Sequence, residues 1–221
     1  MYTYFKRVMD IILGIIILII LLVPILIISL IIKTSSPNDP VIFKSKRAAK
    51  EKKIFFLYKF RTMIINAEDI GGPSTAVDDP RFTSIGRTLR KYKLDELPQL
   101  FNVLKGEISF VGPRPQVFYY VDKYSERNLK ILSVKPGITD FASIFFYDMD
   151  ETLGSNQVDL KYENEIEPIK NKLRLYYVEN ISLKNDVIIL LATFFSLFPF
   201  LRNSLKHSLD FHFKKALQYE N

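Results

Sequence analysis

The stretch LDELPQLFNVLKGEISFVGPRP, residues 94–115, joins a helical pattern to an extended segment and a rigid turn. Its apolar side chains recur at the i, i+3, i+4, i+7 spacing of one buried helix face: Leu97, Leu100, Phe101 and Leu104. We expect a helix that begins near Asp95 and ends at Gly106, because glycine commonly follows the last helical residue. The residues ISFVGPRP should then form a short extended segment, closed by a turn that proline stiffens.

Asp95 and Glu96 open that helix as two adjacent carboxylates, with Pro98 just inside the first turn. One interpretation is structural, because Asp caps helices, Glu suits the first turn and Pro is tolerated there. The other is chemical: a carboxylate can attack phosphorus, and its neighbour can bind Mg²⁺ or handle a proton. The basic residues close by in the sequence favour the chemical interpretation.

Several cationic side chains accompany the carboxylate pair. Arg114 stands between Pro113 and Pro115, so its backbone is restricted and its planar guanidinium is held ready for phosphate oxygens. Upstream of the pair lie Arg81, Arg87, Arg90, Lys91 and Lys93. Lys59 and Arg61 alternate with an aromatic residue in YKFRTM, which predicts one shared strand face. A solvated charged face is the alternative for either of these two.

Residues 11–32, IILGIIILIILLVPILIISLII, carry no charged side chain. As a helix this run would be about 33 Å long at ~1.5 Å per residue, enough to cross the hydrocarbon core of a bilayer. No small-residue cleavage site follows, so we expect a retained membrane segment and not a signal peptide. Basic residues flank both ends and Pro24 lies near the middle. The residues alone leave open a straight span and a re-entrant helix that turns back at Pro24.

The remaining sequence predicts a small mixed domain. The expected elements are two strands of a hairpin (41–47 and 54–63), a loop (66–82), a helix capped by Thr83 or Ser84 (84–94) and a helix within 157–181. Residues 187–201 form a second apolar stretch that is too short to span a bilayer. Basic residues behind it favour a position at the membrane interface, with a core helix as the alternative.

Composition narrows the chemistry further. The 221 residues carry a formal net charge of +7, which favours anionic partners such as nucleic acid, anionic lipid or a phosphorylated substrate. The chain has no cysteine, so disulfides, zinc–thiolate sites and cysteine nucleophiles are excluded. His207 and His212 lie near the C-terminus, where we expect a solvated tail. Catalysis would therefore depend on acids, basic residues or hydroxyls.

Residues 79–115, DPRFTSIGRTLRKYKLDELPQLFNVLKGEISFVGPRP, resemble the core of the bacterial sugar transferases. These are the monotopic polyprenyl-phosphate phosphoglycosyl transferases that initiate capsule, O-antigen and glycoprotein glycan assembly. The motifs KFRTM, DELPQL and GPRP occur in the family's order, and KPGIT and YYVENISLKNDV extend the resemblance over roughly residues 4–195.

The resemblance implies a mechanism. Asp95 would attack the sugar-bearing phosphorus of a UDP-sugar and release UMP, and polyprenyl phosphate would then take the phosphosugar from Asp95. Glu96 would assist, and Mg²⁺ bound by Asp95 and Glu96 would shield the phosphates. Arg90 and Arg114 match family arginines that face phosphate or nucleotide. The complete set expected to bind substrate or phosphate is Lys59, Arg61, Arg81, Arg90, Pro113, Arg114 and Pro115.

The resemblance also implies an architecture. We expect an α+β chain with a re-entrant membrane helix (1–33), a compact, mostly helical cytosolic catalytic domain with a small β-hairpin or sheet (34–185), and an interfacial amphipathic helix with a basic tail (186–221). The catalytic domain would face the cytoplasm at the bacterial inner membrane. Expected partners are a UDP-sugar, polyprenyl phosphate and the lipid bilayer, with no nucleic acid, and a homodimer is left open.

Several residues depart from the family pattern and leave the sugar undetermined; among them, Asp140, Ser143 and Arg174 stand where Gly, Gln and Asp are common. Two other functions compete with the transferase. A membrane-tethered nucleic-acid-binding protein would need no paired acids, and release of UMP from a UDP-sugar would count against it. A non-catalytic scaffold would still complement a deletion after Asp95→Asn.

Overall fold

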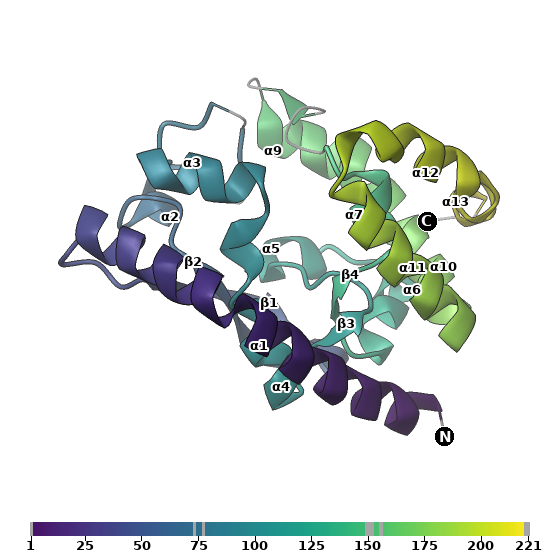
Figure 1. Ribbon diagram of the computed structural model, residues 1–221. Coiled ribbons are helices and arrows are strands. Elements are labelled where there is room, and N and C mark those ends of the chain that lie inside the picture. Colours follow the sequence, from purple (N-terminus) through teal and green to yellow (C-terminus); the bar gives the residue numbers. More distant parts are fainter. Residues whose placement is uncertain (1, 73, 77, 149–152, 155–156, 219–221) are drawn as a thin grey trace.

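The computed structural model describes residues 2–72, 74–76, 78–148, 153–154 and 157–218, and helices dominate it (Figure 1). The main helices are α1 (Tyr2–Ser35), α3 (Ser84–Lys91), α4 (Gln99–Lys105), α10 (Glu167–Glu179) and α11 (Leu183–Ser196). Shorter helices are α2 (Ala67–Ile70), α5 (Phe118–Val121), α6 (Glu126–Leu129), α7 (Phe141–Phe145), α9 (Val158–Lys161), α12 (Arg202–Ser208) and α13 (Asp210–Leu217). The strands are β1 (Ile42–Ala48), β2 (Ile54–Phe60), β3 (Ser109–Val111) and β4 (Gly137–Thr139). The expected mostly helical α+β class is confirmed.

The apolar run forms most of α1, which continues through Pro24 without a break. It is the one helix among the described residues that is long and apolar enough to cross a membrane. Figure 1 shows it as a single rod along one side of the molecule. The reversal expected at Pro24 is therefore absent. Leu21 and Ile25, one on each side of the proline, both pack on the domain.

The domain contacts α1 near both of its ends. At the N-terminal end, Arg7 donates to the carbonyl oxygens of Val103 and Leu104, at 2.6 and 2.7 Å. These are carbonyls of the last turn of α4, where a cation is favourable. Toward the C-terminal end, Ile28 and Ile32 pack in a small core. The opposite face of α1 exposes a run of large apolar side chains.

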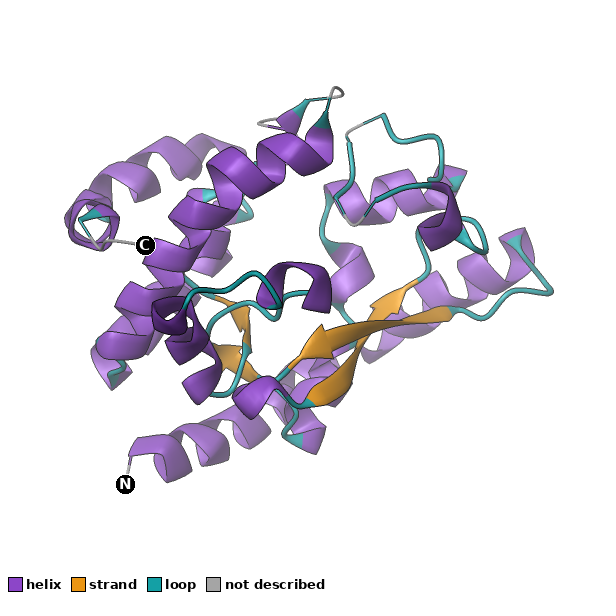
Figure 2. Ribbon diagram, turned by 180° about the vertical axis from the view of Figure 1, so that it is seen from behind, coloured by secondary structure: helices purple, strands orange, loops and turns teal. Residues whose placement is uncertain are grey.

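The hairpin is confirmed: β1 and β2 pair antiparallel with Ile42 opposite Phe60 and Ala48 opposite Ile54. Figure 2 shows it separate from the second sheet, where β3 and β4 pair in parallel. In that sheet Val111 lies opposite Thr139. Gly137 is required there, because a Cβ atom on it would lie 2.2 Å from the backbone nitrogen of Gly112. The turn GPRP is thereby held against KPGIT, a contact that the sequence did not reveal.

The helix after the carboxylate pair differs from its prediction. A 3-10 turn, Leu94–Glu96, comes first, and α4 begins only at Gln99. Leu100 is buried as expected, but Phe101 is 41 % exposed, so its assignment to the buried face was wrong. Asn102 takes the inner position instead, because its amide bonds the backbone of β2: it donates to the Phe56 oxygen at 2.8 Å and accepts from the Tyr58 nitrogen at 2.9 Å.

Two further helices were anticipated. Thr83 caps α3 by accepting from the Gly86 nitrogen at 3.0 Å. The helix within 157–181 is divided into α9, a π-helical turn (Tyr162–Ile166) and α10. The loop over 66–82, residues 73 and 77 lying outside the described residues, contains the short helix α2. The exposure of Phe101 arises where the neighbouring Asn102 bonds β2.

The main core lies between α4, β3, α7, α10 and the C-terminal helices. Its fully buried side chains include Phe141, Leu173, Tyr177 and Ile189, and each such apolar side chain stabilises the fold by roughly 1.5–3 kcal/mol. His207 is exposed as expected, but His212 is not in a solvated tail. It stacks on Phe141 with ring centroids 5.1 Å apart, because α13 folds back onto the core.

Candidate active site

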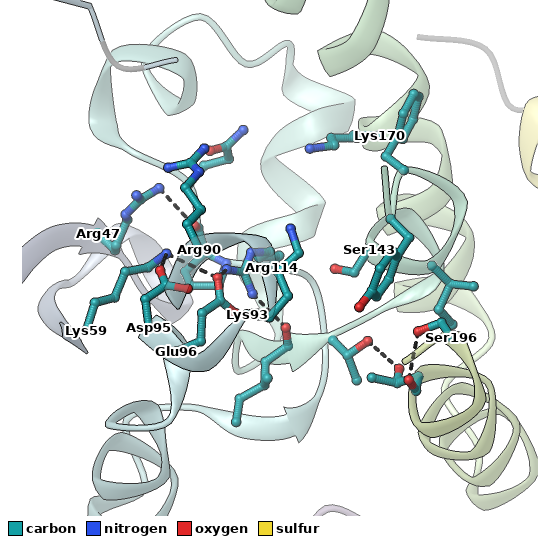
Figure 3. A pocket seen from close by; sticks show the side chains of 18 of the residues that line it. Arg47, Lys59, Arg90, Lys93, Asp95, Glu96, Arg114, Ser143, Lys170 and Ser196 are labelled. Carbon is teal, nitrogen blue, oxygen red and sulfur yellow. Dashed lines mark hydrogen bonds and ion pairs between the residues drawn. The ribbon is translucent and has the colours of Figure 1, made fainter. Parts of the chain in front are cut away.

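A cavity of about 400 Å³ lies between the carboxylate pair and the helices α1, α10 and α11. Ile17 and Leu21 of α1 and Leu197 after α11 form an apolar border. Figure 3 shows Lys59, Asp95 and Glu96 on one side, Ser143 and Lys170 on the other, and Arg114 between them. The cavity therefore joins a charged interior to the apolar side of the molecule.

Asp95 is buried at 4 % exposure and lines this cavity. Its Oδ2 atom lies 3.6 Å from the Lys59 ammonium, and its Oδ1 atom has no hydrogen-bond partner among the described residues. Burial raises the pKa of Asp95 above its usual range; Lys59 opposes this rise and Glu96 adds to it. The result is a carboxylate with one unengaged oxygen, poorly solvated and facing a cavity, as a nucleophile requires.

Glu96 is held differently from its neighbour. Its Oε1 atom accepts from Lys59 at 3.1 Å and from the guanidinium of Arg114. Burial acts to raise the pKa of Glu96, but Arg114 and Lys59 outweigh burial and hold it well below its usual range. Glu96 is therefore an ionised anchor for two cations. The adjacent acids have opposite pKa shifts, which is the pattern of two groups with different roles.

A left-handed residue orients the pair toward the cavity. Lys93 precedes the 3-10 turn with φ 57°, a conformation that a side chain with a Cβ atom rarely adopts. Lys93 and Arg90 line the cavity, as does Arg47 from β1. The Arg90 guanidinium also lies 5.3 Å from the ring centroid of Phe82. This side of the cavity thus gathers cations from β1, β2 and the segment before Asp95.

Four of the predicted substrate-binding residues line the cavity: Lys59, Arg90, Arg114 and Pro115. Arg61, Arg81 and Pro113 do not. β2 ends before Arg61, which turns away and donates to the Pro40 oxygen at 2.8 Å. Arg81 is buried and forms a 2.7 Å ion pair with Asp79. It also donates to backbone oxygens of the 66–82 loop, so in this structure it stabilises that loop.

The far wall of the cavity carries a second cationic group. Lys170 and Arg174 lie one helical turn apart on α10, and both are more than nine-tenths buried. Arg174 is paired with Glu167 at 2.9 Å. Burial and the neighbouring Arg174 lower the pKa of Lys170 to about 7, against the opposing effect of Glu167. Arg174, one of the departures from the family pattern, therefore lies at the cavity wall.

Sequence reasoning missed Arg47, Lys170 and Gln116 as cavity residues. Arg47 and Lys170 had no distinguishing signal, because both lie far from the motif in sequence; Gln116 directly follows Pro115 but carries no charge that would mark it. Asp140 and Ser143 were noted only as departures from a pattern. In the structure Asp140 accepts from the backbone nitrogen of Arg114 and from the hydroxyl of Ser143.

The carboxylates fit Mg²⁺ only in part. Within the described ranges, no three His, Cys, Asp or Glu side chains gather as a metal site. Mg²⁺, however, is commonly held by one or two carboxylates together with substrate phosphates. Asp95 Oδ1 is a buried acceptor without a hydrogen-bond partner in the described part of the chain, and Glu96 is adjacent. These two residues fit a Mg²⁺ ion that the substrate helps to bind.

Comparison with known proteins gives a consistent family. The family model described as bacterial sugar transferase matches residues 1–199. The UDP-N-acetylgalactosamine-undecaprenyl-phosphate N-acetylgalactosaminephosphotransferase of Aeromonas hydrophila is 35 % identical over 200 residues, covering 87 % of this chain and 43 % of that protein.

Two other relatives are named for different sugars. The undecaprenyl-phosphate galactose phosphotransferase of Salmonella typhimurium is 36 % identical, over 73 % of this chain and 34 % of that protein. The UDP-glucose:undecaprenyl-phosphate glucose-1-phosphate transferase of Escherichia coli is 35 % identical, over 86 % of this chain and 39 % of that protein. The chain thus spans less than half the length of these three relatives.

Proposed function

The chain belongs to the bacterial sugar transferase family, and on that premise we propose that it transfers a sugar 1-phosphate from a UDP-sugar to polyprenyl phosphate at a membrane surface. One observation supports this proposal above all others. A buried carboxylate with an unengaged oxygen, Asp95, faces a cavity in which cations surround it, and the exposed apolar helix α1 borders that cavity. An anionic donor and a lipid acceptor could meet there.

The chemistry follows in two displacements at one phosphorus atom. A carboxylate oxygen of Asp95 attacks the sugar-bearing phosphorus, and the bond from that phosphorus to the bridging oxygen breaks. UMP leaves with the bonding electrons, and the phosphosugar stays on Asp95. A phosphate oxygen of the polyprenyl phosphate then attacks the same phosphorus. The Asp95 carboxylate leaves, so the enzyme is regenerated and a polyprenyl-diphosphate sugar is formed.

Like charges oppose both displacements, because a carboxylate must approach a diphosphate. Lys59, Arg90, Arg114 and Lys93 line the cavity and offset that charge. Glu96 keeps Lys59 and Arg114 in place. When bound by Asp95, Glu96 and the donor phosphates, Mg²⁺ would supply further neutralisation of the phosphate oxygens.

The proposal predicts that Arg114→Ala lowers turnover by about 100-fold, since Arg114 keeps Glu96 in place and offers a planar pair of donors to phosphate. Arg114→Lys preserves the charge but not the planar pair of donors, so its turnover should lie between that of Arg114→Ala and that of the wild type. UMP release is the measurement. Arg61→Ala is the matched control, because Arg61 does not line the cavity, and it should stay near wild-type activity. Wild-type turnover in Arg114→Ala would show that Arg114 does not contribute to the reaction.

The function itself is tested by incubating the purified protein with undecaprenyl phosphate and a panel of UDP-sugars, scored for UMP. The panel is needed because the relatives are named for N-acetylgalactosamine, galactose and glucose. Release of UMP with one or more donors, together with a new lipid-linked sugar, is the expected result. Absence of UMP with every donor would contradict the proposal.

We also propose monotopic attachment at the cytoplasmic face of the inner membrane. Lys6 of α1 pairs with Asp186, and Ile32 near the other end packs with Phe60 and Leu89 of the same domain. If α1 crossed the bilayer perpendicular to its plane, the domain bound along its length would have to lie in the hydrocarbon core. The exposed face of α1 and the exposed phenylalanines at the end of α11, Phe194 and Phe195, suit insertion from one side.

A labelling experiment tests this topology. The chain lacks cysteine, so single cysteines at Tyr4 and Ser35 report on the two ends of α1 without background. Tyr4 is preferred to Tyr2, because the Tyr2 hydroxyl donates to Asp186. Both cysteines should be protected from an impermeant maleimide added outside intact cells and should react after permeabilisation. Labelling of either end in intact cells would show a full span.

A further inference from the structure

Asp140 is a fully buried carboxylate that contacts the turn carrying Arg114. Its two oxygens accept from different partners. Oδ2 accepts from the backbone nitrogen of Arg114 at 3.0 Å, while Oδ1 accepts from the backbone nitrogen and the hydroxyl of Ser143, both at 2.7 Å.

These bonds connect α7 to the turn between Pro113 and Pro115. Proline has no backbone N–H, so Arg114 supplies the one backbone donor of the Pro-Arg-Pro segment, and Asp140 accepts it. The Arg114 side chain is fixed at its other end: Nη1 donates to the Ile138 oxygen at 2.8 Å, and Nη2 donates to Glu96. A continuous series of bonds therefore runs from Asp140 through Arg114 to Glu96, the neighbour of Asp95.

We propose that Asp140 is a positioning residue: it fixes the backbone of Arg114 and, through Arg114, the place of Glu96 beside Asp95. The inference rests on the proposed transferase function, in which Asp95 is the nucleophile. Asp140 does not line the cavity, so it acts through Arg114 and touches no substrate. Burial acts to lower the pKa of Arg114, but Glu96 and then Asp140 outweigh burial and raise it.

A simpler role for Asp140 is that of a helix cap, since its Oδ1 atom accepts from the third residue of α7. Two variants separate the roles. Asp140→Ser keeps a hydroxyl that can cap α7 but is too short to hold Arg114 as well. Asn has one acceptor oxygen where Asp has two. In Asp140→Asn the amide NH₂ group must therefore face the donors of either Arg114 or Ser143, and one of these two contacts is lost. Ser182→Ala is the matched control, because Ser182 caps α11 through the Asn185 nitrogen at 3.3 Å, away from Arg114.

For UMP release, Asp140→Ser and Asp140→Asn should lower kcat by roughly 10- to 100-fold, the effect of misplacing a group beside a reacting atom. KM for the UDP-sugar should change by less than about threefold, because Lys59, Arg90 and Lys93 still hold the donor phosphates. Ser182→Ala should leave both constants near wild type. Unchanged kcat in both Asp140 variants, or a rise in KM alone, would overturn the proposal.

A double-mutant cycle tests the route of the effect. If Asp140 acts through Arg114, then adding Asp140→Ser to Arg114→Ala should cost less than about twofold beyond Arg114→Ala alone. Full additivity of the two losses would show that Asp140 does not act through Arg114 and would overturn the proposal.

Hydrogen exchange gives a readout that does not need turnover. In the wild-type protein the Arg114 amide should exchange slowly, because Asp140 accepts it inside the protein. It should lose protection in Asp140→Ser and keep it in Ser182→Ala. Retained protection in Asp140→Ser would overturn the positioning role. If the wild-type protein released no UMP from any donor, the transferase proposal would fail, while this exchange result would still decide whether Asp140 fixes Arg114.

Discussion

Asp95→Asn is expected to lower UMP release by at least about 10³-fold, equal to ~4 kcal/mol of activation free energy. The amide has no anionic oxygen to attack phosphorus, so the covalent step is lost. The fold should be retained. Because burial raises the pKa of Asp95 in the folded protein, its ionisation costs stability at neutral pH, and a neutral side chain removes that cost. The melting temperature should therefore equal or exceed that of the wild type.

Asp148→Asn is a suitable control for this variant. Asp148 pairs with Arg202 at 2.7 Å and does not line the cavity, so the same change of atoms there should leave turnover near wild type. Turnover of Asp95→Asn within about tenfold of wild type, only ~1.4 kcal/mol, would remove Asp95 from the mechanism. Complementation of a deletion by Asp95→Asn would instead support the scaffold function.

Removal of Mg²⁺ is expected to have the second large effect. Thorough chelation should lower UMP release by at least about 100-fold, since neutralisation of phosphate oxygens by a metal is worth several kcal/mol. Re-addition of Mg²⁺ should restore turnover. Among the residues that the structure describes no protein-only metal site is present, so chelation should leave the melting temperature unchanged. Activity that survives chelation would contradict the metal's role, and a fall in melting temperature would indicate a structural metal.

Local patterns predicted much of the fold. The hairpin, the Thr83 cap and the long apolar helix follow from alternation, capping chemistry and hydropathy, all of which act over a few residues. The exposure of Phe101 could not be predicted in the same way. It depends on Asn102 bonding β2, more than forty residues earlier in the chain. The unbroken path of α1 through Pro24 was not predictable either, because proline is tolerated in membrane helices and can also mark a break.

In the candidate site, too, local sequence predicted some residues, and others depend on tertiary structure. Asp95, Glu96 and Arg114 were identified because they share one short motif and have rigid neighbours. Arg61 and Arg81 were expected at the site for their charge and their place in or near the family motifs, and they bond backbone oxygens elsewhere. Lys170 reaches the cavity from α10, a placement set by tertiary structure. Charge near a motif therefore indicates a cation site, but burial and partners decide which cations belong to it.

The central claim is that Asp95 carries the phosphosugar between donor and acceptor, and intact-protein mass spectrometry tests it most directly. Wild-type protein mixed with Mg²⁺ and an accepted UDP-sugar, without polyprenyl phosphate, should release up to one UMP per protein chain. Its mass should rise by that of one sugar phosphate less one water, mapped to Asp95, and the adduct should disappear when polyprenyl phosphate is added. Turnover that requires both substrates together and leaves no adduct, or an adduct on another residue, would contradict the account.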